Sequence, residues 1–220
     1  RIQSEHVGRV LDVDALPSGA PFIVMEFLDG HDLATELKQK GALPQERALT
    51  ILLEACEAVA EAHAAGIVHR DLKPANLFLS RALDGREIVK VLDFGISKIT
   101  SQEPSKDISQ EKALTSANAM LGSPLYMSPE QMQASGDVDL RTDIWSLGVI
   151  LYEMLSGRAP FDAATIPMIC ANVLSMPPPA LGLAGQEEGL ERVIKRCLEK
   201  EPDRRYRDVA HFVRSLQPFA

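Results

Sequence analysis

The distribution of apolar positions divides the chain into a short strand-like part and a longer helical part. Residues 7–13 and 21–28 are apolar runs rich in β-branched and aromatic residues, and Pro17-Ser18-Gly19 between them is a turn signal. We predict two strands joined as a hairpin. From Pro44 to about Ala65, apolar residues recur at helical spacing, and a proline suits the first turn of a helix.

Two further strands and then a mainly helical stretch are expected downstream. Residues 76–80 and 88–92 have strand-like composition and flank a turn at Asp84-Gly85. Residues 100–119 are polar and lack periodicity, which is typical of a loop. Helical spacing returns at residues 141–156, 164–174, 190–199 and 209–216. The pattern therefore predicts an α+β fold with a small strand-bearing part ahead of a larger helical one.

Composition places the chain among ordinary globular domains. Its 220 residues are 45% hydrophobic and 25% charged. A domain of this length buries about 70% of the surface of its unfolded chain, so it needs no disulfide or structural metal. Cys56, Cys170 and Cys197 are odd in number and far apart, which argues against a disulfide framework or a zinc site. We expect a reducing, cytoplasmic setting.

Charge and hydropathy exclude other classes of protein. A net charge of -8 argues against a nucleic-acid partner. The apolar stretch at residues 144–155 is too short to span a bilayer and contains Glu153, so we predict a buried helix and no membrane segment in this piece. The chain opens without an initiator methionine or a signal-peptide pattern, which predicts a longer parent protein that could be tethered to a membrane elsewhere.

The chemistry of the chain is concentrated in residues 69–76, with the sequence HRDLKPAN, and in Asp93-Phe94-Gly95. The first run combines a carboxylate that can accept a hydroxyl proton, an ammonium that can steady a phosphate, and an amide oxygen that can hold a metal. Asp93 adds a second oxygen ligand. Groups of this kind at these offsets indicate a phosphoryl-transfer site.

These motifs resemble those of the eukaryotic-type (Hanks-type) Ser/Thr protein kinase family. Ser128-Pro129-Glu130 stands where the family has Ala-Pro-Glu, and the three motifs follow in the family's order. The resemblance implies a protein-kinase-like fold. Residues 1–28 would be the truncated remnant of the small β lobe, and residues 29–220 the mainly helical large lobe, with the catalytic loop at 69–76 and the activation segment at 93–130. The long turn at residues 81–87 is similar to that of bacterial members.

The resemblance assigns the catalytic residues and the cofactors. Asp71 would be the catalytic carboxylate, and Lys73 would offset charge on the transferring phosphoryl group. Asn76 and Asp93 would hold Mg²⁺ together with the phosphates of ATP. The alternative, in which Asp71 and Asp93 are solvated loop acids, leaves Lys73 and Asn76 without a role.

The resemblance also places the adenosine part of the nucleotide. Met25 would be the gatekeeper, and the backbones of Glu26 and Leu28 would bind the adenine edge. Asp32 would bind the ribose hydroxyls, or it would cap the following helix. Phe78 would pack beneath adenine, although an aromatic residue in a strand also suits the core.

Regulation is implied by Arg70, which in this family awaits a phosphate on the activation loop. Thr115 is the first candidate acceptor and Ser116 the second, against the alternative that both are merely solvated. Ser123 occupies the family's threonine position, where a hydroxyl bridges the catalytic carboxylate and lysine.

Three further residues are expected to have structural roles. Asp143 would hold the backbone of the catalytic loop, and Glu130 would form a buried ion pair with Arg205. His63 and the three cysteines are interpreted as ordinary packing residues.

The departures from the family lie at the N-terminus, where the chain has no Gly-x-Gly-x-x-Gly and no Val-Ala-x-Lys. These parts clamp the ATP phosphates, so the 220 residues alone are expected to be nearly inactive. We favour an active kinase that phosphorylates Ser and Thr residues of proteins and that a homodimer could activate. The alternatives are a pseudokinase acting as an interaction module, and a small-molecule phosphotransferase.

Overall fold

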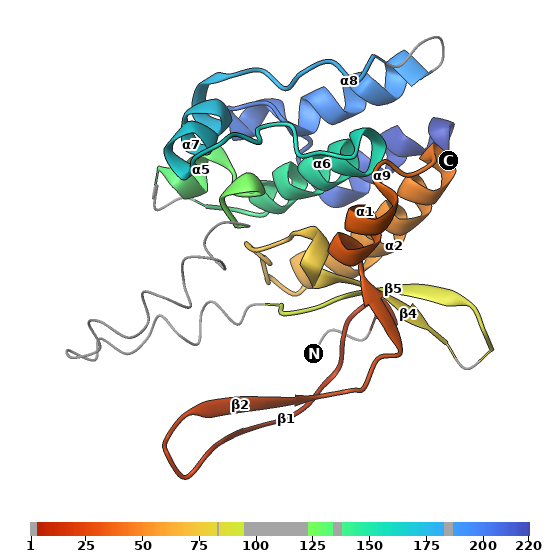
Figure 1. Ribbon diagram of the computed structural model, residues 1–220, viewed down its shortest axis with the longest axis vertical. Helices are drawn as coiled ribbons and strands as arrows, with labels where there is room; N and C mark the ends of the chain where they lie inside the picture. The colour runs from red at the N-terminus through yellow and green to blue at the C-terminus, as the bar shows by residue number, and fades with distance from the viewer. Residues whose placement is uncertain (1–3, 83, 95–122, 134–137, 183–186) are drawn as a thin grey trace.

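The computed structural model describes residues 4–82, 84–94, 123–133, 138–182 and 187–220 (Figure 1). The strands all lie before residue 92, with two α-helices between the third and fourth strands, and the described elements after residue 92 are helices, so the predicted α+β class is confirmed. The strands are β1 (Val10–Ala15), β2 (Pro21–Met25), β3 (Gly30–Asp32), β4 (Leu77–Arg81) and β5 (Glu87–Val91). The α-helices are α1 (Leu33–Lys40), α2 (Gln45–Ala64), α5 (Pro129–Met132), α6 (Arg141–Ser156), α7 (Ile166–Ser175), α8 (Glu187–Cys197) and α9 (Val209–Leu216).

Strands β1 and β2 form the predicted antiparallel hairpin, which projects away from the helices (Figure 1). Gly19 closes its turn with a positive φ of 83°. Both predicted strands were too long. The first begins at Val10 because Val7 makes a parallel bridge with Val91 instead. The second ends at Met25 because the chain then leaves the hairpin to enter β3.

The second sheet has the strand order β3-β4-β5, with both pairs antiparallel. Val89 and Val91 of β5 are 2% and 0% exposed, and the intervening Lys90 points to the opposite face. The predicted β4 started one residue early because Asn76 ends a 3₁₀ turn at Pro74–Asn76. The predicted β5 was displaced by one residue because the Leu92 N–H donates to the Asn76 carbonyl rather than to the sheet.

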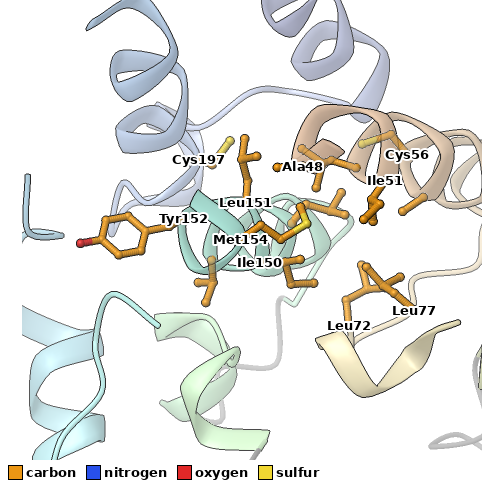
Figure 2. Packing of buried hydrophobic residues seen from close by; sticks show 14 of the residues in the cluster. Ala48, Ile51, Cys56, Leu72, Leu77, Ile150, Leu151, Tyr152, Met154 and Cys197 are labelled. Carbon is orange, nitrogen blue, oxygen red and sulfur yellow. The ribbon is translucent and has the colours of Figure 1, made fainter. Parts of the chain in front are cut away.

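Helix α6 is the centre of the core, where it packs against α2 and α8 (Figure 2). It has the bounds that its apolar pattern predicts, and its side chains from Thr142 to Tyr152 are all buried. Gly148 permits the close approach of α8, because a Cβ at this position would lie 2.4 Å from Cys197 Cβ. Trp145 stacks on Phe161 with ring centroids 5.4 Å apart.

The remaining helices differ slightly from prediction. Helix α7 begins at Ile166 because the Thr165 side chain caps it. Helix α8 spans residues 187–197 rather than 190–199, and the main-chain N–H of Leu198 still bonds back to Ile194 beyond its end. Helix α9 has its predicted bounds, set by an Asp208 cap. Within the described ranges, the helices are too short or too polar to cross a bilayer.

Candidate active site

The catalytic loop follows directly from helix α2. Helix α2 ends at Ala64, and Gly66 turns the chain with a φ of 74°. Among the described residues, Arg70 and Asp93 are the two non-glycine residues with positive φ, at 69° and 63°. This conformation is costly for an L-residue, and it persists only where the surrounding structure enforces it.

Asp143, in the first turn of α6, holds the backbone at Arg70 in this conformation. Its side chain is fully buried, Oδ2 accepts the His69 N–H at 2.9 Å, and Oδ1 accepts the Arg70 N–H at 2.9 Å. One carboxylate therefore fixes two successive peptide groups immediately before Asp71. This is the contact to the catalytic-loop backbone that the sequence analysis expected of Asp143.

His63 was predicted to be an ordinary packing residue, and that interpretation is wrong. Its Nε2 lies 2.7 Å from Asp143 Oδ2, and its side chain is only 8% exposed. The two residues are 80 positions apart, so helical spacing within α2 gave no sign of the contact. His63 therefore helps to orient the Asp143 carboxylate.

Asp71 and Lys73 form a close ion pair at the surface of the loop. Lys73 Nζ donates to Asp71 Oδ2 at 2.7 Å, and the two side chains are 24% and 45% exposed. Asn76 Nδ2 donates to the Asp71 carbonyl at 2.8 Å and approaches Asp71 Oδ2 at 3.4 Å. The three polar side chains expected to act together are therefore adjacent, and a bound molecule can reach the carboxylate.

Asp93 is brought beside Asn76 by backbone contacts. The Leu92 N–H donates to the Asn76 carbonyl at 2.9 Å, and the Leu92 carbonyl lies 2.8 Å from His69 Nε2. His69 also packs edge-on against Phe94, with ring centroids 4.8 Å apart. These contacts fix the backbone on both sides of Asp93, whose side chain is exposed.

The residues predicted to bind adenosine lie in two places, on the second sheet and at the end of the hairpin. Asp32 and Phe78 are directly opposite each other on β3 and β4, so their side chains share one face of the sheet. Met25, Glu26 and Leu28 lie half-buried at the end of the hairpin. Since the Glu26 N–H already donates to the Arg9 carbonyl at 3.0 Å, a base at this edge would use the Glu26 carbonyl.

Asp32 caps helix α1, because its Oδ1 accepts the Thr35 N–H at 2.7 Å. Replacing Asp32 with alanine should therefore lower the free energy of unfolding by about 1 kcal/mol, whereas serine should preserve most of it. If the carboxylate also binds ribose, both variants should raise the KM for ATP. Urea unfolding and ATP titration separate the two roles. Wild-type stability in the alanine variant would contradict the cap, and an unchanged KM in the serine variant would contradict ribose binding.

Glu130 and Arg205 form a buried bidentate ion pair. Both nitrogen–oxygen distances are 2.8 Å, and the two side chains are 10% and 0% exposed. Helix α5, which carries Glu130, is capped by Ser128. Gln131 Nε2 donates to the Arg70 carbonyl at 2.7 Å. Gln131, which links this helix to the catalytic loop, belongs to none of the motifs in the sequence and was not predicted.

The regulatory residues are only partly visible. Thr115 and Ser116 lie outside the described residues, as does most of the activation segment. Ser123 begins a 3₁₀ helix at Ser123–Leu125. The next residue, Tyr126, is held against α6, because its hydroxyl donates to Glu153 Oε2 at 2.7 Å. Burial raises the pKa of Glu153.

Most of the chain is similar in sequence to known proteins. Residues 1–214 match the family described as the protein kinase domain. The chain is 40% identical over 218 residues to the serine/threonine-protein kinase Pkn1 of Myxococcus xanthus, covering 98% of this chain and 30% of Pkn1. It is 37% identical over 193 residues to PknB of Mycobacterium leprae, which is also named a serine/threonine-protein kinase, covering 86% of this chain and 29% of PknB. The chain therefore spans about a third or less of these relatives.

Proposed function

The chain belongs to the protein kinase family, and from this we propose that its parent protein is a Ser/Thr protein kinase that transfers the γ-phosphoryl group of Mg-ATP to hydroxyl groups of other proteins. The contact between Asp71 Oδ2 and Lys73 Nζ at 2.7 Å is the observation that carries this proposal. It pairs a proton acceptor with a cation, and both groups face the surface where a hydroxyl substrate can approach.

Each residue then has a defined task. Asp71 orients the substrate hydroxyl and accepts its proton as the oxygen attacks the γ-phosphorus, while the bond from that phosphorus to the leaving ADP breaks. Lys73 offsets the negative charge that develops on the transferring oxygens. The Asn76 amide nitrogen is hydrogen-bonded to Asp71. The Asn76 amide oxygen, together with the Asp93 carboxylate, would therefore coordinate the metal ion. Oxygen donors of this kind fit Mg²⁺, which when bound neutralises phosphate charge.

The nucleotide would lie between the hairpin and the second sheet. The backbones of Glu26 and Leu28 would bind adenine behind the gatekeeper Met25. Phe78 would support the base, and Asp32 would bind the ribose. The shared face of Asp32 and Phe78 supports this placement. Under this proposal residues 1–28 are the end of the small lobe and residues 29–220 the large lobe.

Phosphorylation of the activation loop would regulate transfer through Arg70. Arg70 Nε is buried and has no hydrogen-bond partner among the described residues, while Nη2 makes one weak contact to the Val138 carbonyl at 3.4 Å. A guanidinium held in this way is suited to a phosphate. Thr115, and after it Ser116, are the proposed acceptors, and a homodimer would bring one activation loop to the site of the other copy. We place the protein in the cytoplasm.

A pseudokinase is the second candidate. It would be an interaction module without transfer activity, and these 220 residues contain neither a glycine-rich loop nor a Val-Ala-x-Lys motif. For the same reason these residues alone should transfer phosphate very poorly. The presence of Asp71, Lys73, Asn76 and Asp93 together favours the active enzyme.

The decisive experiment supplies the full-length gene product with radiolabelled ATP, Mg²⁺ and a generic protein substrate. We expect label on Ser and Thr, which phosphoamino-acid analysis identifies, and no transfer when EDTA removes the metal. Full-length protein that binds ATP but transfers no label would favour the pseudokinase.

A further inference from the structure

An ion pair between Glu26, whose backbone was predicted to bind adenine, and Lys90, which was not predicted as a site residue, joins the end of the hairpin to strand β5. Lys90 Nζ donates to Glu26 Oε1 at 2.9 Å, and the side chains of the two residues are only 14% and 15% exposed. The same Oε1 accepts the Arg9 N–H at 2.9 Å. Burial raises the pKa of Glu26, but the hydrogen bonds from Lys90 and Arg9 outweigh it, so the pKa lies below its usual value. The carboxylate is therefore a charged, well-bound group.

The position of Lys90 on the sheet gives this contact its significance. Lys90 pairs directly with Phe78 across β4 and β5, and Phe78 pairs with Asp32 across β3 and β4. Directly opposed residues share a face, so Lys90 lies on the same face as the two residues predicted to contact adenine and ribose. Strand β5 ends at Val91, two residues before Asp93.

A nearby apolar contact joins the same two segments. A Cβ placed on Gly8 would lie 2.6 Å from Leu92 Cδ2 and 3.4 Å from Met25 Cε. The side chains of Met25 and Leu92 therefore both lie close to Gly8, and these two residues directly precede Glu26 and Asp93. The apolar contact holds the segments together, but apolar side chains can slide over one another, whereas the charged hydrogen bond of Lys90 fixes a direction.

We propose that Lys90 and the Glu26 carboxylate are positioning residues, whose ion pair fixes the adenine-binding backbone of residues 26–28 relative to Asp93. This inference rests on the proposed function. A nucleotide spans the two segments, with its base at one and its phosphates at the other. Holding both ends at a fixed separation lets base binding place the γ-phosphoryl group correctly, which is the main contribution of a kinase to its reaction.

The test uses the full-length protein and replaces Lys90 with methionine, which keeps the length of the side chain and removes the charge. The KM for Mg-ATP should rise about 10-fold, because misplacement of the two halves weakens the joint binding of base and phosphates. Calorimetry should show weaker binding of Mg-ADP with little change for adenosine, which does not reach Asp93. If the ion pair had a purely structural role, the substitution would lower the melting temperature. The difference in affinity between Mg-ADP and adenosine would then stay as it is in the wild type.

Three further variants make the result interpretable. Glu26→Gln should reproduce the effect, and the double variant should be no worse than either single one, because the two residues act as a pair. Arg86→Met is the matched control, since Arg86 forms an exposed ion pair with Asp84 on the same β4–β5 hairpin. Wild-type KM in the Lys90 variant would overturn the inference. Absence of Mg-dependent transfer in the wild-type protein would instead overturn the proposed function.

Discussion

Replacing Asp71 with asparagine should lower kcat for phosphoryl transfer by about 10²- to 10⁴-fold, the usual contribution of a positioned general base. Asparagine keeps the shape of the side chain but cannot accept the hydroxyl proton. The KM for ATP should change little, because the proposed contacts to the base and ribose lie on other elements. Initial rates with the full-length protein, measured over a range of ATP concentrations, separate the two parameters.

The environment of Asp71 predicts that a substitution at this position will act on catalysis rather than on folding. Its side chain is 45% exposed, so the loss of its charge leaves no deeply buried group stranded. The loop conformation depends on Asp143, which binds the preceding peptide groups and is unaffected. The melting temperature should therefore stay near that of the wild type.

Asp84→Asn provides the control, because Asp84 is an exposed carboxylate paired with Arg86 in the turn between β4 and β5. Its kcat should equal that of the wild type. If Asp71→Asn also retains wild-type kcat, the assigned role of Asp71 is wrong.

The second large effect should come from Arg205→Ala, with a loss of about 3–5 kcal/mol in the free energy of unfolding. The Arg205 side chain is fully buried, and its loss leaves the Glu130 carboxylate without its bidentate partner. Arg205 also donates to three carbonyls, those of Glu199, Arg141 and Lys200, at 2.8, 3.1 and 3.2 Å. For a chain of this size the melting temperature should fall by roughly 10 °C, which calorimetry would detect.

Two comparisons identify the cause. Arg207→Ala removes an exposed ion pair with Asp208, whose side chains are 77% and 40% exposed, and should cost about 0–1 kcal/mol. Arg205→Lys keeps the charge but not the planar guanidinium, so its free energy of unfolding should lie between those of the two alanine variants. An Arg205→Ala protein no less stable than the Arg207→Ala protein would show that the buried pair contributes nothing.

Local patterns predicted the central helices well, because their signals lie within the helices or at their ends. Helix α6 is apolar over most of its length and is followed by Gly157 in a left-handed conformation, and α9 starts at an Asp208 cap. The strands were predicted less well. The bridge between Val7 and Val91 and the bond from Leu92 to Asn76 join distant segments, and such contacts set strand ends without changing composition.

The same distinction holds for the candidate site. The motif at residues 69–76 suggested the identity and role of its polar residues, since those chemical types occur together at short spacing. His63, Gln131 and Lys90 gave no such signal. Each acts through a partner at least 61 positions away in sequence, His63 on Asp143, Gln131 on the Arg70 carbonyl, and Lys90 on Glu26.

The sequence by itself determined the family and the α+β class of this protein, and it supplied the polar groups of the proposed phosphoryl-transfer site. Only the tertiary structure decided how those groups are held. Asp143 enforces the strained loop from α6, Arg205 binds Glu130 across 75 residues, and Lys90 joins β5 to the hairpin. The physical reason is that reactive groups are defined by residue type, whereas their orientation depends on hydrogen bonds between segments that meet only when the chain folds.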